Sequence, residues 1–412
     1  MFRQILLLAV TRRGRLLLLL AAVVYLAAWA FGSTVLYPVA VGLSLAVALA
    51  WVWARTLRRP MRLERRTGHS DHLEGADVLV DVELEPEGAL TPGSALLVEQ
   101  IGRLGEHATV LERRGHKLTA RYLLHGLPRG RYVFTDVRIV LDDPFGLERV
   151  EQPIAGDGTL LVYPRLVDLD RVFTEGIEAH QGRRLAMWRP AGFDLHSVRE
   201  YQQGDSLRKV HWPTTARRGE LMVKDFDDAA RDEVAVVLDA AATPVVGTAP
   251  DSSFEAQVRA AGSILQAQMR AGRRSVLVVN DARRSAQDVH SPGAEWRQAY
   301  ELLAAIEPDA PEPVASLLAD DSSPAARALE LVVVTAALTP ALADRLAQRA
   351  RARRRVSVVF VDAASFAAPH RAAPEPLLLR LQATGIPLAV VRNGDDLAER
   401  LAPPTREPAA HG

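Results

Sequence analysis

The sequence predicts a multi-domain chain with a two-helix transmembrane hairpin at its N-terminus, then an all-β sandwich, then an α/β doubly wound domain. Three patterns in the 412 residues carry this prediction. Two long apolar runs stand close together near the N-terminus, a region of alternating apolar residues follows, and short buried strands then alternate with helical segments. A chain of this length has room for two or three domains with separate cores.

These patterns divide the chain into five segments. We predict a hairpin with basic flanks over residues 1–62, the β-sandwich over 63–165, a linking segment over 166–228, the α/β domain over 229–395 and a disordered tail over 396–412.

Charge and cysteine content argue against several classes of function. Lys plus Arg and Asp plus Glu each number 50, so no net charge steers the chain toward nucleic acid, and we predict no nucleic-acid partner. The absence of cysteine excludes thiol nucleophiles, disulfides and thiolate zinc sites.

The two apolar runs cover residues 16–32 and 35–54, and each is near the ~20 residues that a helix needs to cross a bilayer. Arginines flank the pair on its outer sides: Arg3, Arg12, Arg13 and Arg15 before the first run, and Arg55, Arg58, Arg59, Arg62, Arg65 and Arg66 after the second. The positive-inside rule then places both termini and the soluble domains in the cytoplasm. We therefore predict a multi-pass protein of the cell membrane, with the lipid bilayer as a partner.

The alternative is a secretory signal peptide, because a basic start, an apolar core and the run Ala28-Trp29-Ala30 resemble an export signal with its cleavage site. The second apolar run, with six arginines behind it, would act as a stop-transfer segment. The protein stays in the membrane under either interpretation.

Between about residues 75 and 165, apolar residues recur at every second position, which is typical of half-buried antiparallel strands. The alternation is clearest over residues 78–84, 118–124 and 133–141. Turn sequences such as Pro92-Gly93 separate these runs, and together they predict a small β-sandwich.

A run rich in arginine and aromatic residues follows this region. Its distinctive positions are Arg199, Tyr201, Gly204, Asp205, Arg208, Val210, Trp212, Ala216 and Arg217. The run resembles the signature of the bacterial "domain of unknown function 58" family, and residues 129–132 and 143–147 also look like features of that family. Because the family's molecular function is unsettled, the resemblance implies an architecture rather than a reaction.

Two roles for this signature stay open: a structural clasp between domains, or a surface that binds an anion or a partner protein through its arginines and flat rings. Asp205 is expected to cap a short helix that Pro213 ends. A catalytic function would use Asp205 with His211, but no third group accompanies them, and we assign no catalytic residue. The residues assigned to partner binding or to the clasp are Arg199, Tyr201, Gly204, Asp205, Arg208, His211, Trp212 and Arg217.

From residue 233 onward, buried strands alternate with helices. Strands are expected over residues 234–238, 275–280, 331–335, 356–362 and 387–391, with helices over 254–271, 295–306 and 340–353. This order predicts a parallel, doubly wound sheet whose ligands bind beyond the carboxyl ends of its strands.

Asp239 stands at the end of the first of these strands. The domain resembles a von Willebrand factor A domain, in which this strand typically ends in D-x-S-x-S and holds a divalent cation. Here Ala241 replaces the first serine, and only Asp239 and Thr243 remain as candidate ligands. We therefore predict no cofactor, with magnesium as the alternative.

We predict a membrane-anchored, non-catalytic adaptor or assembly factor rather than an enzyme. The family resemblance implies partners in a cell-envelope process, because members are commonly encoded beside MoxR-type AAA+ ATPases and transglutaminase-like membrane proteins. Two alternatives stay open: a cation-dependent, ligand-binding A-type domain, and an enzyme acting on an envelope component. Against the enzyme stands the lack of a phosphate-binding loop, an H-E-x-x-H helix or a G-x-S-x-G elbow.

Overall fold

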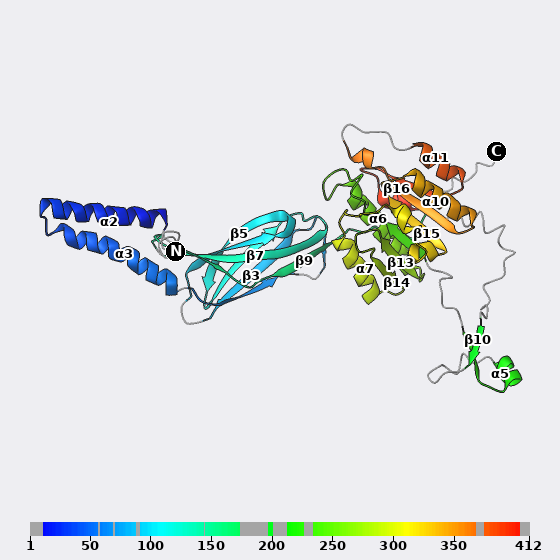
Figure 1. Cartoon of the computed structure of the whole chain (residues 1–412), viewed down its shortest axis with the longest axis horizontal. Helices are drawn as coiled ribbons and strands as arrows, with labels where there is room; N and C mark the ends of the chain where they lie inside the picture. The colour runs from blue at the N-terminus through cyan, green and yellow to red at the C-terminus, as the bar shows by residue number, and fades with distance from the viewer. Residues whose placement is uncertain are drawn as a thin grey trace. The chain divides into compact units, whose positions relative to one another are not determined.

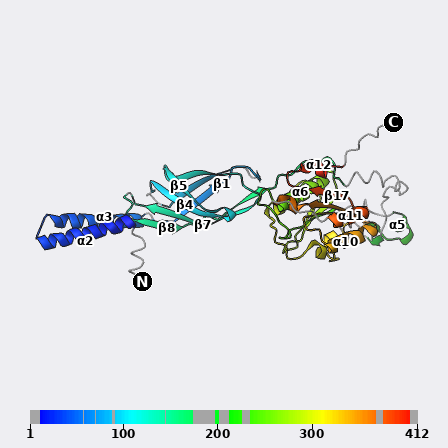
Figure 2. The same ribbon diagram turned by 90° about the horizontal axis from the view of Figure 1, so that it is seen from above.

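The computed structural model describes residues 11–56, 58–68, 71–87, 91–143, 145–173, 197–200, 212–225, 234–367 and 375–403 (Figures 1 and 2). The chain divides into two compact units, Met1–Tyr163 and Pro164–Gly412. The first unit holds two apolar helices and a β-sheet, and the second holds a sheet covered by helices.

Helices α2 (Arg12–Phe31) and α3 (Leu36–Thr56) form the hairpin, and both are long and apolar enough to cross a bilayer. Thr11 caps the start of α2, since its hydroxyl accepts a hydrogen bond from the Gly14 amide. Gly32 ends α2 with a φ of 63°, a left-handed conformation that glycine adopts without strain. Small side chains such as Ala28 and Ala40 are buried, whereas most leucines point outward, an arrangement suited to lipid rather than water.

The β-sheet of the first unit follows the hairpin. Its strands are β1 (Met61–Arg66), β2 (His72–Leu73), β3 (Val78–Pro86), β4 (Ser94–Ile101), β5 (Gly105–Arg114), β6 (Lys117–Leu124), β7 (Gly130–Asp142), β8 (Arg149–Pro153) and β9 (Gly158–Tyr163). Hydrogen bonds join them in the order β1-β3-β6-β5-β4-β7-β9-β2, with β8 also paired to β7. Neighbours are antiparallel except for the short parallel pair β2 and β9.

This domain is one curled sheet where we expected the two separate sheets of a sandwich (Figure 1). The difference arises at the β5–β6 hairpin, where Glu112, Arg113 and Arg114 pair with Thr119, Leu118 and Lys117. These three residue pairs connect the arm β1-β3-β6 to the arm that begins with β5 and β4. The alternating apolar residues of both arms still face a single core, as the sequence pattern predicted.

The second unit contains a six-stranded sheet in the order β14-β13-β12-β15-β16-β17. Its strands are β12 (Val234–Leu238), β13 (Ser275–Val279), β14 (Ala286–Val289), β15 (Glu330–Thr335), β16 (Arg355–Val361) and β17 (Leu388–Val391). All neighbours are parallel except β13 and β14. The strand order reverses between β12 and β15, which is the switch point where doubly wound sheets bind ligands.

Helices cover both faces of this sheet. Those found are α6 (Ser253–Arg270), α7 (Ala294–Ala305), α8 (Val314–Leu317), α9 (Pro324–Arg327), α10 (Pro340–Arg351), α11 (Glu375–Ala383) and α12 (Leu397–Leu401). One core contains α6, α7 and α12, and the opposite core contains α8, α9, α10 and α11. Strand residues alternate between the two cores, as Val236 and Val237 do, so the predicted doubly wound α/β architecture is confirmed.

Two segments that we expected outside the α/β domain belong to its core. Leu169, Val172 and Phe173 are buried against the sheet, although we placed them in the linking segment. Leu401 is also fully buried, and its carbonyl accepts a hydrogen bond from the Phe173 amide at 2.8 Å. Residues 397–401 therefore form a packed helix, whereas we expected the disordered tail to begin at residue 396.

Candidate functional site

The signature lies between two strands that pair with each other. Strands β10 (Ser197–Glu200) and β11 (Met222–Asp225) form a separate two-stranded antiparallel sheet, and Arg199 pairs with Val223. The last pair of this ladder is Glu200 with Met222, so these two residues lie opposite each other. Five predicted site residues lie outside the described part of the chain: Tyr201, Gly204, Asp205, Arg208 and His211.

Helix α5 (Trp212–Arg218) carries the remaining signature residues, Trp212 and Arg217. The helix is held to β11 because the Thr215 hydroxyl accepts a hydrogen bond from the Met222 amide at 3.0 Å. Pro213 is the second residue of α5, whereas we expected it to end a helix. A proline is tolerated in the first helical turn because its missing N–H would have no partner there.

Helix α5 exposes an aromatic ring at its start and positive charge in its last turn. Trp212 is 65% exposed, and Arg217 and Arg218 are exposed in the last turn. Burial of a tryptophan ring against a partner contributes favourable binding free energy. Tryptophan and arginine are also enriched among the residues that dominate protein interfaces. These exposed residues of the signature are a candidate docking surface, and the name docking surface is used below for Trp212, Arg217 and Arg218.

A second candidate site lies at the switch point of the parallel sheet, around Asp239. This aspartate follows β12 and is only 4% exposed. Its Oδ1 accepts hydrogen bonds from the Ala241 amide at 3.1 Å and from Asn280 Nδ2 at 3.0 Å. Its Oδ2 accepts the hydroxyl of Thr335 at 2.6 Å. Both carboxylate oxygens are thus occupied by donors of the protein itself.

Asn280 and Thr335 complete this network, although sequence reasoning gave neither of them a role. Asn280 follows β13, and its Oδ1 accepts a hydrogen bond from the Ala240 amide at 2.7 Å. Thr335 ends β15, and its hydroxyl oxygen also accepts from the Ala337 amide at 2.9 Å. Their positions at the carboxyl ends of the two strands beside β12 were the available signal, since parallel strands bring such ends together.

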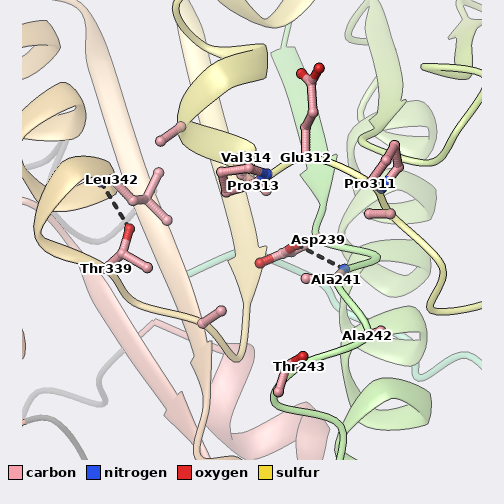
Figure 3. A pocket seen from close by; sticks show the side chains of 13 residues that line it. Asp239, Ala241, Ala242, Thr243, Pro311, Glu312, Pro313, Val314, Thr339 and Leu342 are labelled. Carbon is pink, nitrogen blue, oxygen red and sulfur yellow. Dashed lines mark hydrogen bonds between the residues drawn. The ribbon is translucent and has the colours of Figure 1, made fainter.

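A pocket of about 220 Å³ opens next to this network (Figure 3). It is lined by Asp239, Ala241, Ala242, Thr243, Ala310, Pro311, Glu312, Pro313, Val314, Ala315, Ala337, Thr339 and Leu342. The Glu312 side chain points away from Asp239 in Figure 3 and pairs with Arg284 at 2.8 Å. Thr243 lines the pocket but forms no hydrogen bond with Asp239.

This geometry favours a structural role for Asp239 over metal binding. A hard cation needs several oxygen ligands, whereas three donors of the protein already take most of the roughly four lone-pair positions of this carboxylate. Among the described residues, no group of three or more His, Asp or Glu side chains is arranged to hold a metal ion. The predicted ligand pair, Asp239 and Thr243, is therefore brought to one pocket but not to one coordination centre.

Residues 129–132 and 143–147, which also resemble family features, shape the β-sheet domain. The Tyr132 hydroxyl donates to the Pro128 carbonyl at 2.8 Å. The Asp143 carboxylate accepts hydrogen bonds from the amides of Phe145, Leu147 and Glu148 and so fixes a tight loop. These contacts are structural, and they leave the docking surface and the strand-end pocket as the candidate sites.

Comparison with known proteins agrees with the class that the signature indicated. The model of a family described as "Protein of unknown function DUF58" matches residues 197–372. That range runs from β10 across the docking surface and most of the α/β domain.

A curated relative is the uncharacterized protein YeaD of Bacillus subtilis (strain 168). It is 27% identical over 231 residues, which cover 54% of this chain and 54% of YeaD. The chain thus spans about half the length of the curated relative that it matches.

Solved structures give only weak likenesses. A conjugative transposon lipoprotein from Bacteroides eggerthii is 16% identical with a TM-score of 0.14, over 24% of this chain and 98% of its own. Cwp6 from Clostridium difficile is 8% identical with a TM-score of 0.16, over 82% of this chain and 52% of its own. TM-scores this low do not establish a shared fold.

Proposed function

We propose that this protein is a membrane-anchored, non-catalytic adaptor or assembly factor that docks a partner protein through its signature segment. The observation that carries the proposal is the 65% exposure of Trp212, in the same short helix as the exposed Arg217. An exposed tryptophan with arginines is suited to docking, because these residue types dominate the binding energy of many protein interfaces. The partner we propose is a MoxR-type AAA+ ATPase acting in a cell-envelope process, with a transglutaminase-like membrane protein as a further component.

The hairpin supplies the anchor in this proposal. Helices α2 and α3 expose large apolar side chains along their lengths, and arginines stand at the ends where α2 begins and α3 finishes. Apolar helices with basic residues at one end span the bilayer with that end in the cytoplasm. Both termini, the β-sheet domain and the α/β domain would then face the cytoplasm, where an ATPase can reach the docking surface.

We also infer that the α/β domain is a von Willebrand factor A-like domain that has lost its cation site. Its strand order and the position of Asp239 support this inference, and the hydrogen bonds from Asn280 and Thr335 account for the loss. The alternative of cation-dependent ligand binding is less well supported, because the carboxylate has no oxygen left without a donor.

Affinity purification of the full-length protein from its own membranes tests the docking proposal. Trp212→Ala and Arg217→Ala are expected to lose the partner while keeping the thermal stability of the unmodified protein, since both side chains are exposed. Arg351→Ala is a matched control, because Arg351 is also an exposed arginine in the last turn of a helix.

A second variant separates docking from folding. Replacing residues 201–221 by a two-residue Asn-Gly turn should keep the pairing of β10 with β11, because Glu200 and Met222 face each other across the ladder. Loss of the partner from this stable variant supports docking. Early melting of Trp212→Ala, or retention of the ATPase by every variant, would contradict the proposal and favour a clasp.

A further inference from the structure

Six arginines stand at the two chain ends of the hairpin, where α2 begins and α3 ends. Arg12, Arg13 and Arg15 lie at the start of α2, and Arg55, Arg58 and Arg59 lie at or just after the end of α3. Among the described residues, none of the six forms a salt bridge, whereas arginines of the adjoining sheet are paired, as in Arg65–Glu99, Arg121–Asp81 and Arg149–Asp142. The charge at the hairpin end is therefore available to a ligand.

Two of these arginines line a pocket. The pocket has a volume of about 340 Å³ and lies between the segment after α3 and strand β8, with Arg58, Arg59, Pro60, Glu151, Gln152 and Pro153 around it. Gln152 Nε2 donates to the Arg59 carbonyl at 2.7 Å, which ties β8 to the end of the hairpin. Arg59 Nε donates to the Thr56 carbonyl at 3.3 Å, so the arginine is held at the end of α3.

We propose that Arg58 and Arg59 bind the phosphate of an anionic glycerophospholipid in this pocket. The inference rests on the membrane anchoring proposed above, which puts residues two and three positions after α3 at the level of the lipid headgroups. Guanidinium groups match phosphate oxygens through parallel N–H donors. Basic pockets at the cytoplasmic end of membrane helices bind the headgroups of anionic lipids by this chemistry.

The loop after Asp143 supports placing this end of the hairpin at the level of the lipid headgroups. The Thr11 hydroxyl donates to the Gly146 carbonyl at 2.7 Å, so the loop that follows Asp143 lies against the start of α2. Leu147 from this loop packs against Val47 and Ala50 of α3. Phe145, in the same loop, is 75% exposed. An exposed aromatic ring beside the end of a membrane helix is suited to the interface between headgroups and acyl chains.

Two acidic residues near the pocket weaken its positive electrostatic potential. Glu151 is an exposed member of the pocket lining, and Arg58 acts electrostatically on the buried Glu148. Neither carboxylate forms a salt bridge with Arg58 or Arg59 among the described residues, so each weakens the positive field without occupying the guanidinium donors. Removing the charge of Glu151 should therefore strengthen lipid binding.

The test uses the full-length protein reconstituted into vesicles of phosphatidylcholine, or of equal parts phosphatidylcholine and phosphatidylglycerol. Spin-labelled forms of both lipids give the ratio of their association constants at the protein surface. We expect a preference for phosphatidylglycerol that falls by about fivefold in Arg58→Gln and again in Arg59→Gln, as roughly 1 kcal/mol for each basic residue implies. Glu151→Gln is expected to raise the preference.

Arg131→Gln is the matched control. Arg131 is an exposed arginine near the start of β7, at the far end of that strand from the hairpin, and about 40 Å separates the two ends of so long a strand. This control should keep the full preference, and thermal melts should be alike for all variants.

Four results would contradict the proposal or the anchoring on which it rests. Equal loss in Arg131→Gln, or no preference in the unmodified protein, rules out a headgroup site. Inorganic phosphate that binds in phosphatidylcholine vesicles with the same dependence on Arg58, without any preference for phosphatidylglycerol, identifies a site for soluble phosphate instead. Failure of the protein to float with phosphatidylcholine vesicles would refute the anchoring itself, which is a separate outcome.

Discussion

Replacing Thr335 by valine is expected to destabilise the α/β domain by about 3 kcal/mol. The Thr335 side chain is fully buried, and its hydroxyl donates to Asp239 Oδ2 at 2.6 Å and accepts from the Ala337 amide at 2.9 Å. A hydrogen bond to a charged group contributes about 1.5–3 kcal/mol and a neutral one about 1 kcal/mol. Valine fills the same space but leaves a buried carboxylate oxygen and an amide without this partner.

Thermal unfolding of the full-length protein in detergent measures this effect. For a domain of this size, 1 kcal/mol corresponds to about 2–4 °C, so the melting temperature of the α/β domain should fall by about 6–12 °C. Thr243→Val is the matched control, because Thr243 lines the same pocket, is exposed and makes no hydrogen bond to Asp239. A Thr335→Val protein that melts like this control would refute the idea that internal donors satisfy the Asp239 carboxylate.

Three further predictions use the same thermal assay. Magnesium should leave the melting temperature unchanged, because protein donors already occupy the strand-end carboxylate, and a rise with magnesium concentration would reveal a cation site. Burial, with the charge of Asp143, raises the pKa of Glu148 above its ordinary 4.5. The folded state then keeps a proton that the unfolded state has released, so this stability is complete below pH 4.5 and is lost as the pH rises through the folded pKa. Glu148→Gln should accordingly have a higher melting temperature than the unmodified protein at about pH 8 but not at about pH 4. The same melting temperature for the two proteins at both pH values would contradict this. Arg349 donates to the Ala326 and Ala328 carbonyls, and its burial lowers its pKa to about 10. Arg349→Met should lower the free energy of unfolding by about 2 kcal/mol, and an unchanged melting temperature would show that these hydrogen bonds do not stabilise the fold.

Much of the fold followed from local patterns in the sequence. The run of five apolar residues from Val234 to Leu238 is buried on both faces of a parallel sheet, and the alternation over residues 78–84 forms a strand with one face in the core. Apolar length alone predicted the hairpin helices. These elements were predictable because each depends on residues near one another in the chain.

The candidate sites depend on contacts between distant residues, which sequence patterns do not reveal. Asp239 was a predicted site residue, but its partners Asn280 and Thr335 lie 41 and 96 positions away. The bond from Gln152 to the Arg59 carbonyl spans 93 positions. Pro213 shows a local ambiguity, because proline can follow a helix or stand in its first turn, and the chemistry of the residue fits both.

The contacts of Thr11 and Gln152 also bear on how force passes through this molecule. Thr11 joins the sheet to the start of α2, and Gln152 joins it to the chain just beyond α3. Because the β-sheet domain contacts the hairpin at two points, its rotation about either contact is restricted by the other. A pull on the β-sheet domain would therefore be transmitted to both helices together, and a torque would tilt the hairpin instead of being dissipated in a linker.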